Sequence, residues 1–585
     1  MSALYLLSTL LFAALAAALQ QCKCLPGDPC FPDSATWNNF SETLSSPVLS
    51  GIRPLASVCY PDDASYSSAM CAIANASQYD ASYRAASVNT VQYINFEQLI
   101  STNGTVDGCP FPSSSAVDSV CYQGRVPSYA VNASTVQDIQ NTLRFATEHN
   151  LHLVVKNTGH ELMGRAFGVG SLELHTLNLK DMNFSDTFIP AGAPNNISGQ
   201  YVTLGAGAQW GDVYAEAEKH GRVLGGGFSP GGTVGAAAGW VLGAGHSVLG
   251  PFYGLGVDNA LQFTVVLPNS SHVTVNNYLN PDLFWALRGG GGPSFGVVTS
   301  TTYKTHPSVP ITAVFYSATA NSSTAYRALL ETWFQVHNTL SDSGWSGVWP
   351  FLDNSLYLTF FAQGTPPYNS TANSTMEGFF ASSRAIPGVN VTLAISVPYP
   401  SFEAWNIDNL VDSSKGYGFN YTAFSAGVDF ALSSWILPRN VTASPMASVV
   451  ANICMNITFG AGYMVAGGAV AEVDPDSASV TPAWRTAISD INATPSVDPA
   501  NPLEAQQIAT QQIQPFRELA PVSAGGGQYL NEPDSLEQDW QEAYWGSHYP
   551  RLLSIKEALD PHDLLIVRKG VNSEQWDDQV VCKNV

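Results

Sequence analysis

The chain has 585 residues, of which 45% are hydrophobic and 12% charged, and its formal net charge is −23. A chain of this length exceeds one hydrophobic core, so we expect roughly two to four folding units. The abundance of glycine (49) and proline (36) favours turns and strands over helical bundles. The negative charge repels phosphate backbones and anionic lipids, so we expect no nucleic acid and no membrane partner.

Residues 1–20 form one apolar run that is followed by the polar sequence QQCKC. Small residues, Ala16 and Ala18, stand where a signal peptidase could cut, and we interpret 1–20 as a signal peptide for secretion. The alternative is a transmembrane anchor. The run is short for an anchor, and it has no basic flank, which weakens both interpretations.

Two features downstream agree with export. Fifteen Asn-x-Ser/Thr acceptors predict N-glycans, which attach only on the secretory route. They are Asn39, Asn75, Asn103, Asn132, Asn183, Asn196, Asn269, Asn321, Asn369, Asn373, Asn390, Asn420, Asn440, Asn456 and Asn492. Seven of the nine cysteines lie between Cys22 and Cys121, which predicts a disulfide-stapled N-terminal extension over 21–120. Because the count is odd, at least one thiol is free or pairs between chains.

An α/β region follows this extension. Residues 135–150 have helical spacing behind an N-cap at Ser134 or Thr135, and the apolar run 151–155 reads as a buried strand. The strand enters a glycine-punctuated loop, 156–170, which is too long for a simple turn.

Two further glycine-dense stretches cover 225–256 and 288–296. Glycine permits positive φ and lets backbone N–H groups approach a ligand closely. Tight turns would explain any single stretch. The three together favour a large anionic cofactor wrapped by main chain.

The composition changes after residue 306. Residues 307–515 contain alternating strands such as 356–361 and helical segments such as 320–338 without glycine clusters, which predicts a separate substrate domain. Residues 516–585 carry GGGQYLNEPD (525–534) and an amphipathic helix over 544–561 that ends at Pro561. The eleven histidines do not pair with cysteines or carboxylates at ligand spacing, so we predict no metal site.

In chain order, the segments VVKNTGHELMGR, TVGAAAGWVLGAGHS, YGLGVDN, DLFWALRGGGGPSFGVVT, YLNEPD and WGSHYPRLLSIKEALDP resemble the vanillyl-alcohol-oxidase superfamily. The resemblance is strongest to berberine-bridge-enzyme-like fungal oxidases. It implies an α+β fold, with a two-subdomain PCMH-type FAD-binding domain over 121–306 and an antiparallel-sheet substrate (cap) domain over 307–515. Residues 516–585 then form a C-terminal berberine-bridge-like segment that returns to the FAD domain.

The resemblance also implies the residues that hold FAD. A histidine after glycine in the first loop bonds covalently to the flavin in this family, and that position here is His160, after Gly159; an imidazole suits such a nucleophilic role. The alternative for a lone histidine is a hydrogen-bonded structural residue. The other predicted cofactor-binding residues are Lys156, Asn157, Thr158, Gly159, Gly164, Thr233, Val234, Gly235, Gly239, Gly296, Val298 and Asn531.

Two further positions bear on the flavin chemistry that the resemblance implies. Many relatives add a second flavin bond from a cysteine in C-P-T-V-G, whereas this chain has Gly231 at the cysteine position. We therefore predict a single covalent link, through His160. Val234 stands where relatives place a small residue that admits O2 to the flavin, which favours an oxidase; the alternative is a core valine.

The catalytic base departs from the family pattern. Relatives commonly have Y-x-N-Y, and the matching run here is Tyr529-Leu530-Asn531-Glu532. Glu532 could accept a substrate proton if burial keeps its basicity in a useful range; the alternative is a structural residue that caps the next turn. Tyr253 matches a tyrosine that lines the same pocket in relatives and is the second candidate.

These features predict a secreted FAD-dependent oxidase. Hydride would pass from a small alcohol-type or specialised-metabolite substrate to flavin N5, and O2 would reoxidise the flavin to give H2O2. The alternatives are an oligosaccharide oxidase and a secreted flavin-binding glycoprotein with little turnover. A structural cell-wall or carbohydrate-binding glycoprotein would leave the ordered glycine motifs unexplained.

Overall fold

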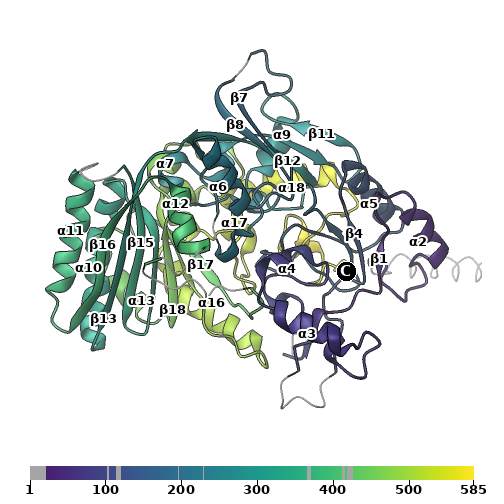
Figure 1. Cartoon of the computed structure of the whole chain (residues 1–585), viewed down its shortest axis with the longest axis horizontal. Coiled ribbons are helices and arrows are strands. Elements are labelled where there is room, and N and C mark those ends of the chain that lie inside the picture. The colour runs from purple at the N-terminus through teal and green to yellow at the C-terminus, as the bar shows by residue number, and fades with distance from the viewer. Residues whose placement is uncertain are drawn as a thin grey trace, which may run out of the picture.

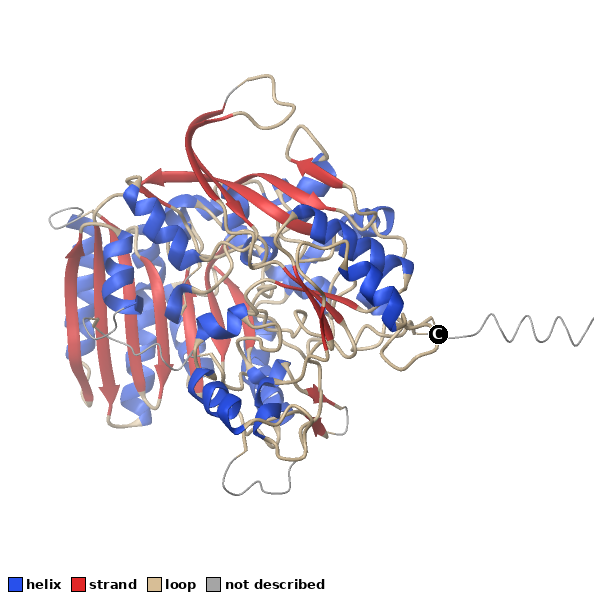
Figure 2. Cartoon of the chain, turned by 45° about the vertical axis from the view of Figure 1, so that its right-hand side comes forward, coloured by secondary structure: helices blue, strands red, loops and turns tan. Residues whose placement is uncertain are grey.

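A computed structural model describes residues 21–101, 104–112, 120–195, 197–227, 229–364, 370–411, 416–417 and 426–584. The predicted signal peptide and the acceptors Asn103, Asn196, Asn369 and Asn420 lie outside these residues. The fold is α+β, as predicted, with sheets and helices mixed along the chain (Figure 2). Within these ranges, no helix is both long and apolar enough to cross a bilayer.

The first sheet has four strands in the order β1-β4-β6-β5. The strands are β1 (Leu49–Ser50), β4 (Tyr129–Asn132), β6 (Leu172–His175) and β5 (Leu153–Lys156), and β4-β6-β5 run parallel. Helix α5 (Val136–Glu148) crosses between β4 and β5. It begins at a capping box of Thr135 and Asp138, which satisfies otherwise unpaired N–H groups. Because β1 belongs to the N-terminal extension, that extension contributes a strand to this sheet.

The second sheet is antiparallel, in the order β11-β10-β12-β8-β7, and β9 pairs with β12. Its strands are β7 (Met182–Phe188), β8 (Ile197–Gly205), β9 (Arg222–Val223), β10 (Ala260–Val266), β11 (His272–Val275) and β12 (Val297–Pro307). Its helices are α6 (Trp210–Lys219), α7 (Gly250–Tyr253), α8 (Gly256–Asn259) and α9 (Pro281–Leu287). The two sheets together enclose the glycine-rich stretches that the sequence singled out.

A seven-stranded antiparallel sheet stands at the opposite end of the molecule, on the left of Figure 1. Its order is β16-β13-β15-β14-β18-β19-β17. The strands are β13 (Ile311–Ala320), β14 (Ser346–Leu352), β15 (Ser355–Gln363), β16 (Val389–Tyr399), β17 (Ser433–Pro438), β18 (Phe459–Met464) and β19 (Ala487–Ala493). Every strand of this sheet therefore lies within the region predicted for the substrate domain.

Helices α10 (Ser323–Asp342), α11 (Ser370–Arg384) and α13 (Ala447–Cys454) gather beside this sheet in Figure 1. Helix α10 buries Tyr326, Leu330, Trp333 and His337, a spacing of three and four residues that forms one apolar stripe. The side chain of Ser322 caps its first turn. Both the helix predicted over 320–338 and the strand predicted over 356–361 are present, as α10 and β15.

Further helices connect these sheets. They are α2 (Ser34–Ser41), α3 (Ser68–Ser77), α4 (Ala81–Ala86), α12 (Phe402–Asn406), α14 (Gly468–Ala471), α15 (Ala483–Thr486), α16 (Pro502–Leu519), α17 (Trp540–Trp545) and α18 (Tyr549–Leu559). The single helix predicted over 544–561 is wrong at its start. Gly546, at φ 54°, ends α17, and α18 begins only at Tyr549, with Pro550 in its first turn.

A buried ion pair joins the seven-stranded sheet to the second sheet. Arg485, on α15, donates from both terminal nitrogens to the carboxylate of Asp258, on α8, and both distances are 2.8 Å. The two side chains are 4% and 6% exposed. A bidentate pair of this kind fixes orientation as well as distance.

Four disulfides lie in the described part of the chain, and Cys454 is a buried free thiol. The odd cysteine count therefore reflects an unpaired core residue. Three bridges, Cys24–Cys30, Cys59–Cys71 and Cys109–Cys121, staple the N-terminal extension as predicted. The fourth joins Cys22 to Cys582, across 560 residues, and so ties the N-terminal extension to the C-terminal segment.

We expect loss of Cys22–Cys582 to destabilise the protein more than loss of Cys59–Cys71. In the chain-entropy model the cost grows with the logarithm of loop length, which gives about 3 kcal/mol for the short loop and about twice that for the long one. Calorimetric Tm values of the C22S/C582S and C59S/C71S proteins test this. An equal or smaller loss for C22S/C582S would contradict it.

Candidate active site

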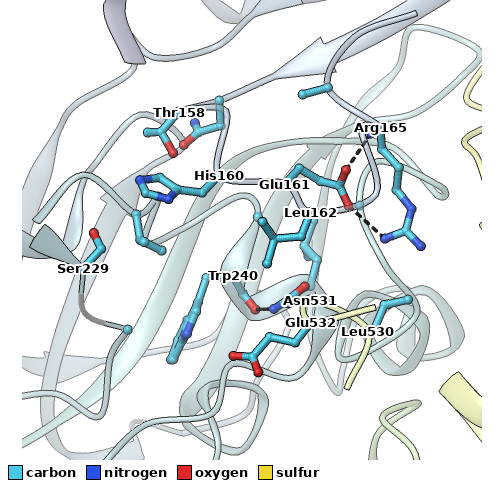
Figure 3. A pocket seen from close by; sticks show the side chains of 18 of the residues that line it. Thr158, His160, Glu161, Leu162, Arg165, Ser229, Trp240, Leu530, Asn531 and Glu532 are labelled. Atoms are coloured by element: carbon cyan, nitrogen blue, oxygen red, sulfur yellow. Dashed lines mark hydrogen bonds and ion pairs between the residues drawn. The ribbon is translucent and has the colours of Figure 1, made fainter. Parts of the chain in front are cut away.

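A cavity of about 320 Å³ lies where the glycine-rich loops of the first and second sheets meet the seven-stranded sheet. Its walls come from the loop after β5, the segment 234–248, the loop before β12, strands β14 and β18, and the turn 529–532 (Figure 3). The predicted site residues on its surface are Asn157, Thr158, Gly159, His160, Val234, Gly235, Gly239, Gly296, Val298, Asn531 and Glu532. Predicted residues from four separate chain segments thus meet at one cavity.

His160 is held neutral. Its Nε2 lies 2.8 Å from Thr233 Oγ1. Thr233 does not line the cavity, but this contact orients the His160 ring. Burial lowers the pKa of His160 to about 4. At neutral pH the imidazole therefore keeps a free lone pair, which a nucleophile requires.

Lys156 and Gly164 lie behind the cavity wall and do not line it. The Nζ of Lys156 donates to the carbonyls of Arg84, at 3.2 Å, and Ser87, and burial lowers its pKa to about 8. Gly164, at φ +75°, accepts a hydrogen bond from Arg125 Nη2 at 2.7 Å. Both residues thus shape the loop 156–170 from outside the cavity lining, and their contact with a cofactor stays a prediction.

Glu532 points into the cavity. Its Oε1 lies 2.8 Å from His246 Nε2, and its Oε2 accepts from Asn492 Nδ2 at 3.1 Å. The neighbouring Asn531 donates to the carbonyl of Trp240 at 2.8 Å (Figure 3). These contacts aim the Glu532 carboxyl group at the cavity, which is not the geometry of a residue that caps the following turn.

Tyr253 lies outside the cavity that contains Glu532. It is absent from the cavity lining; its ring stacks on His306 with centroids 4.0 Å apart, and its hydroxyl accepts from Gln363 Nε2 at 2.7 Å. Nothing in this arrangement offers its oxygen to a molecule in the cavity. Of the two candidate bases, only Glu532 has a position from which it could reach a substrate.

Three residues near the Glu532 carboxyl group were not predicted as site residues: His246, Asp490 and Asn492. His246 lies in the quoted motif GAGHS, and Asp490 and Asn492 lie on β19, whose seven residues are all buried. The available signal was the sequence AISDINA, since an acidic residue inside an otherwise buried strand needs a partner. One predicted glycan acceptor is corrected here: Asn492 is 3% exposed and bound to Glu532, so no glycan can attach to it.

The wall around Glu532 is largely apolar and aromatic. Tyr93 and Phe430 stack with centroids 4.7 Å apart. The other members of this wall are Val348, Pro350, Leu432, Ala461 and Tyr463. Tyr93 belongs to the disulfide-stapled N-terminal extension, which therefore contributes to the cavity as well as to stability.

Val234 lines the cavity and also packs against the main core. Both interpretations of this residue are thus compatible with its place, and its role in O2 access stays a prediction. Gly231 is exposed and does not line the cavity within the described residues.

An FAD cofactor fits this cavity. Gly239 lies on its surface, and a Cβ there would meet no protein atom within 4 Å, so the glycine leaves space for a ligand. The loops 157–160 and 291–298 bring main chain to the same cavity, as binding of an anionic group requires.

Comparisons with known proteins agree with this site. A model described as an FAD binding domain matches residues 127–276, and one described as berberine and berberine like matches residues 528–572. An uncharacterised FAD-linked oxidoreductase of Arthroderma benhamiae is 35% identical over 584 residues, covering 96% of each chain. FAD-linked oxidoreductase malF of Malbranchea aurantiaca is 30% identical, covering 96% of this chain and 94% of its own.

Solved structures show the same architecture. The VAO-type flavoprotein MtVAO713 from Myceliophthora thermophila C1 has a TM-score of 0.83 at 25% identity and covers 97% of this chain and 100% of its own. Glucooligosaccharide oxidase from Acremonium strictum has a TM-score of 0.62 at 20% identity and covers 76% and 91%. At that identity the second likeness shows the fold alone.

We expect Gly239→Val to lower flavin content. The new side chain would extend into space that no protein atom fills, and so would compete with the cofactor. The ratio of flavin to protein absorbance in the purified protein measures this. The matched control is Gly378→Val, at an exposed glycine whose Cβ also meets nothing within 4 Å; similar flavin ratios in the two variants would place the cofactor elsewhere.

Proposed function

Because the chain belongs to the berberine-bridge-enzyme-like FAD-linked oxidoreductases of the vanillyl-alcohol-oxidase superfamily, we propose that it is a secreted oxidase of a small, largely apolar substrate. The observation that carries the proposal is one cavity with a neutral histidine, His160, on one wall and an oriented carboxyl group, Glu532, on another. The four disulfides support secretion, since such bonds persist in oxidising compartments.

FAD, when bound, supplies the redox chemistry: it accepts hydride from a substrate carbon and is reoxidised by O2 to give H2O2. The protein binds and orients both molecules. Backbone around Gly159, Gly235 and Gly296 would hold the cofactor, and Tyr93, Phe430 and Tyr463 would enclose the substrate. Glu532 would accept the proton of the substrate hydroxyl or amine while hydride leaves the adjacent carbon.

His160 is the proposed covalent attachment point. In the tautomer in which Nε2 donates to Thr233 Oγ1, the free lone pair is on Nδ1, which is then the nitrogen able to react. The Acremonium strictum glucooligosaccharide oxidase carries a 6-S-cysteinyl, 8α-N1-histidyl FAD. In this chain the position of the second attachment is Gly231, so the proposed link is histidyl only.

Oligosaccharide oxidases are among the structural neighbours, but the substrate wall of this cavity favours another substrate class. Val348, Pro350, Phe430, Leu432 and Ala461 offer no side-chain donors or acceptors, so hydrogen bonds to sugar hydroxyls would be limited to Tyr93, Tyr463 and the polar groups around Glu532. A compact molecule with apolar surface and one oxidisable hydroxyl or amine suits this wall better.

The attachment is tested with His160→Ala. We expect flavin to precipitate with the acid-denatured wild-type chain and to stay in the supernatant with the variant, because the nucleophile has been removed. His220→Ala is the control, since that side chain is 44% exposed and remote from the cavity. Flavin that remains on the denatured His160→Ala chain would refute the assignment.

The reaction is tested by H2O2 release from a panel of alcohols, amines, phenolics and sugars, with wild type and Glu532→Gln compared. We expect an apolar alcohol or amine to give H2O2, and the variant to be slower by about 10²- to 10⁴-fold, the usual contribution of a general base.

Glu518→Gln, at an exposed glutamate, is the matched control and should behave as wild type. Failure of every compound to bleach the flavin anaerobically would favour the flavin-binding glycoprotein with little turnover. A Glu532→Gln protein as active as wild type would remove Glu532 from the reaction.

A further inference from the structure

Asp490 is buried beside Glu532. It is 0% exposed, and among the described residues neither of its carboxyl oxygens has a partner with hydrogen-bond geometry. It shares a face of β19 with Asn492, because side chains alternate along a strand. Since Asn492 donates to Glu532 Oε2 at 3.1 Å, the Asp490 carboxyl group faces the same glutamate.

Glu532 is surrounded by donors. His246 contacts Oε1 and Asn492 contacts Oε2. The backbone carbonyl of Glu532 in turn accepts from Ser434 Oγ at 2.7 Å, on the neighbouring strand β17. Glu532 is therefore fixed as an acceptor on both side-chain oxygens, while Asp490 beside it is not.

An ionised Asp490 would be unfavourable in this setting. Burial first, and then the nearby charge of Glu532, raise the pKa of Asp490 well above its ordinary 3.8, and the backbone of Ile491 opposes this shift by less. The charge of Glu532 also acts on Tyr93 and Tyr529. Burial first, and then this charge, raise the pKa of each hydroxyl. No lysine or arginine is among the groups that act on Asp490, and the His246 imidazole contacts Glu532 Oε1 rather than Asp490.

We propose that Asp490 and Glu532 form a carboxyl pair that holds one proton between them, with His246 and Asn492 fixing the orientation of Glu532. The resting pair then carries one negative charge, on the side that faces the cavity. Two neighbouring carboxyl groups in a buried site do not both ionise at ordinary pH, because their negative charges would repel each other. Asp490 is a positioning residue, because it touches Glu532 and not the cavity.

The catalytic consequence rests on the proposed function. When the substrate O–H or N–H bond breaks, its proton bonds to Glu532 and the charge of the pair changes from −1 to 0. The electron pair of the adjacent C–H bond leaves as hydride to the flavin, and the proton returns to solvent after the product departs. Asp490 thereby lets Glu532 present a single charge to an apolar cavity.

The first test is the pH dependence of stability, which needs no substrate. The native chain keeps the Asp490 proton above pH 4, whereas the unfolded chain releases it near 3.8. The unfolded state therefore binds fewer protons, and Asp490 makes stability fall as pH rises from about 4 toward the raised native value. We expect Asp490→Asn to remove this contribution.

Accordingly, the Tm of wild type minus that of Asp490→Asn should fall by about 2 °C or more between pH 4.5 and pH 8. Asp498→Asn, which changes an exposed carboxylate just beyond β19, is the control for the charge change. A pH-independent difference between wild type and Asp490→Asn would overturn the shared proton.

The second test follows the flavin absorbance of the holoenzyme against pH. Ionisation of the pair should perturb the spectrum of wild type at a pH well above 3.8. Asp490→Asn should abolish this transition, and Glu532→Gln should move it down by about one pH unit or more, since Asp490 loses its like-charged neighbour. The same transition in all three proteins would refute the pair.

These readouts separate the inference from the proposed function. If no substrate releases H2O2 but both the stability slope and the spectral transition depend on Asp490, the carboxyl pair stands and the oxidase assignment fails. If turnover depends on Glu532 but neither readout responds to Asp490→Asn, the oxidase stands and the pair fails.

Discussion

A cavity between two sheets keeps its shape only if the sheets keep their spacing, and the buried Arg485–Asp258 pair fixes that spacing here. Both side chains are nearly inaccessible, and both hydrogen bonds are 2.8 Å. Removal of one partner from such a pair leaves an uncompensated buried charge, which costs about 3–5 kcal/mol. Because α15 leads directly into β19, the pair also sets the position of the strand that carries Asp490 and Asn492.

The turn 529–532 depends on that spacing, since it contacts both sides of the cavity. Asn531 is bound to the carbonyl of Trp240, on the glycine-rich side, whereas Glu532 is bound to Asn492, on the seven-stranded sheet. A shift of one sheet against the other would break one of these bonds. The position of the carboxyl group is therefore a property of the assembled sheets rather than of its own segment.

The N-terminal extension takes part in the same arrangement. It adds β1 to the first sheet, accepts the buried Lys156 through the carbonyls of α4 and its C-cap, and supplies Tyr93 to the substrate wall. The disulfide from Cys22 to Cys582 joins it to the chain end. Formation of this disulfide and assembly of the cavity are thus linked through the N-terminal extension.

The sequence by itself determined the features whose cause is local. The capping box at Thr135, the apolar stripe of α10 and the glycine loops follow from short-range rules. The α+β fold and the family could be predicted from the resemblance that the ordered motifs carry, and most of the residues predicted for the cofactor lie on one cavity. A position that must leave space for a ligand can be recognised in the sequence because a single glycine provides that space, as at Gly239.

Only the tertiary structure decided the substrate side. Tyr253 lies in a recognisable motif but packs on His306, away from the cavity, whereas His246 and Asp490 drew no attention in the sequence and meet Glu532 across separations of 286 and 42 residues. Pairing of β19 with its neighbours and the docking of two sheets bring these groups together. No local pattern encodes such contacts, because the energy of a buried charge depends on which distant groups surround it.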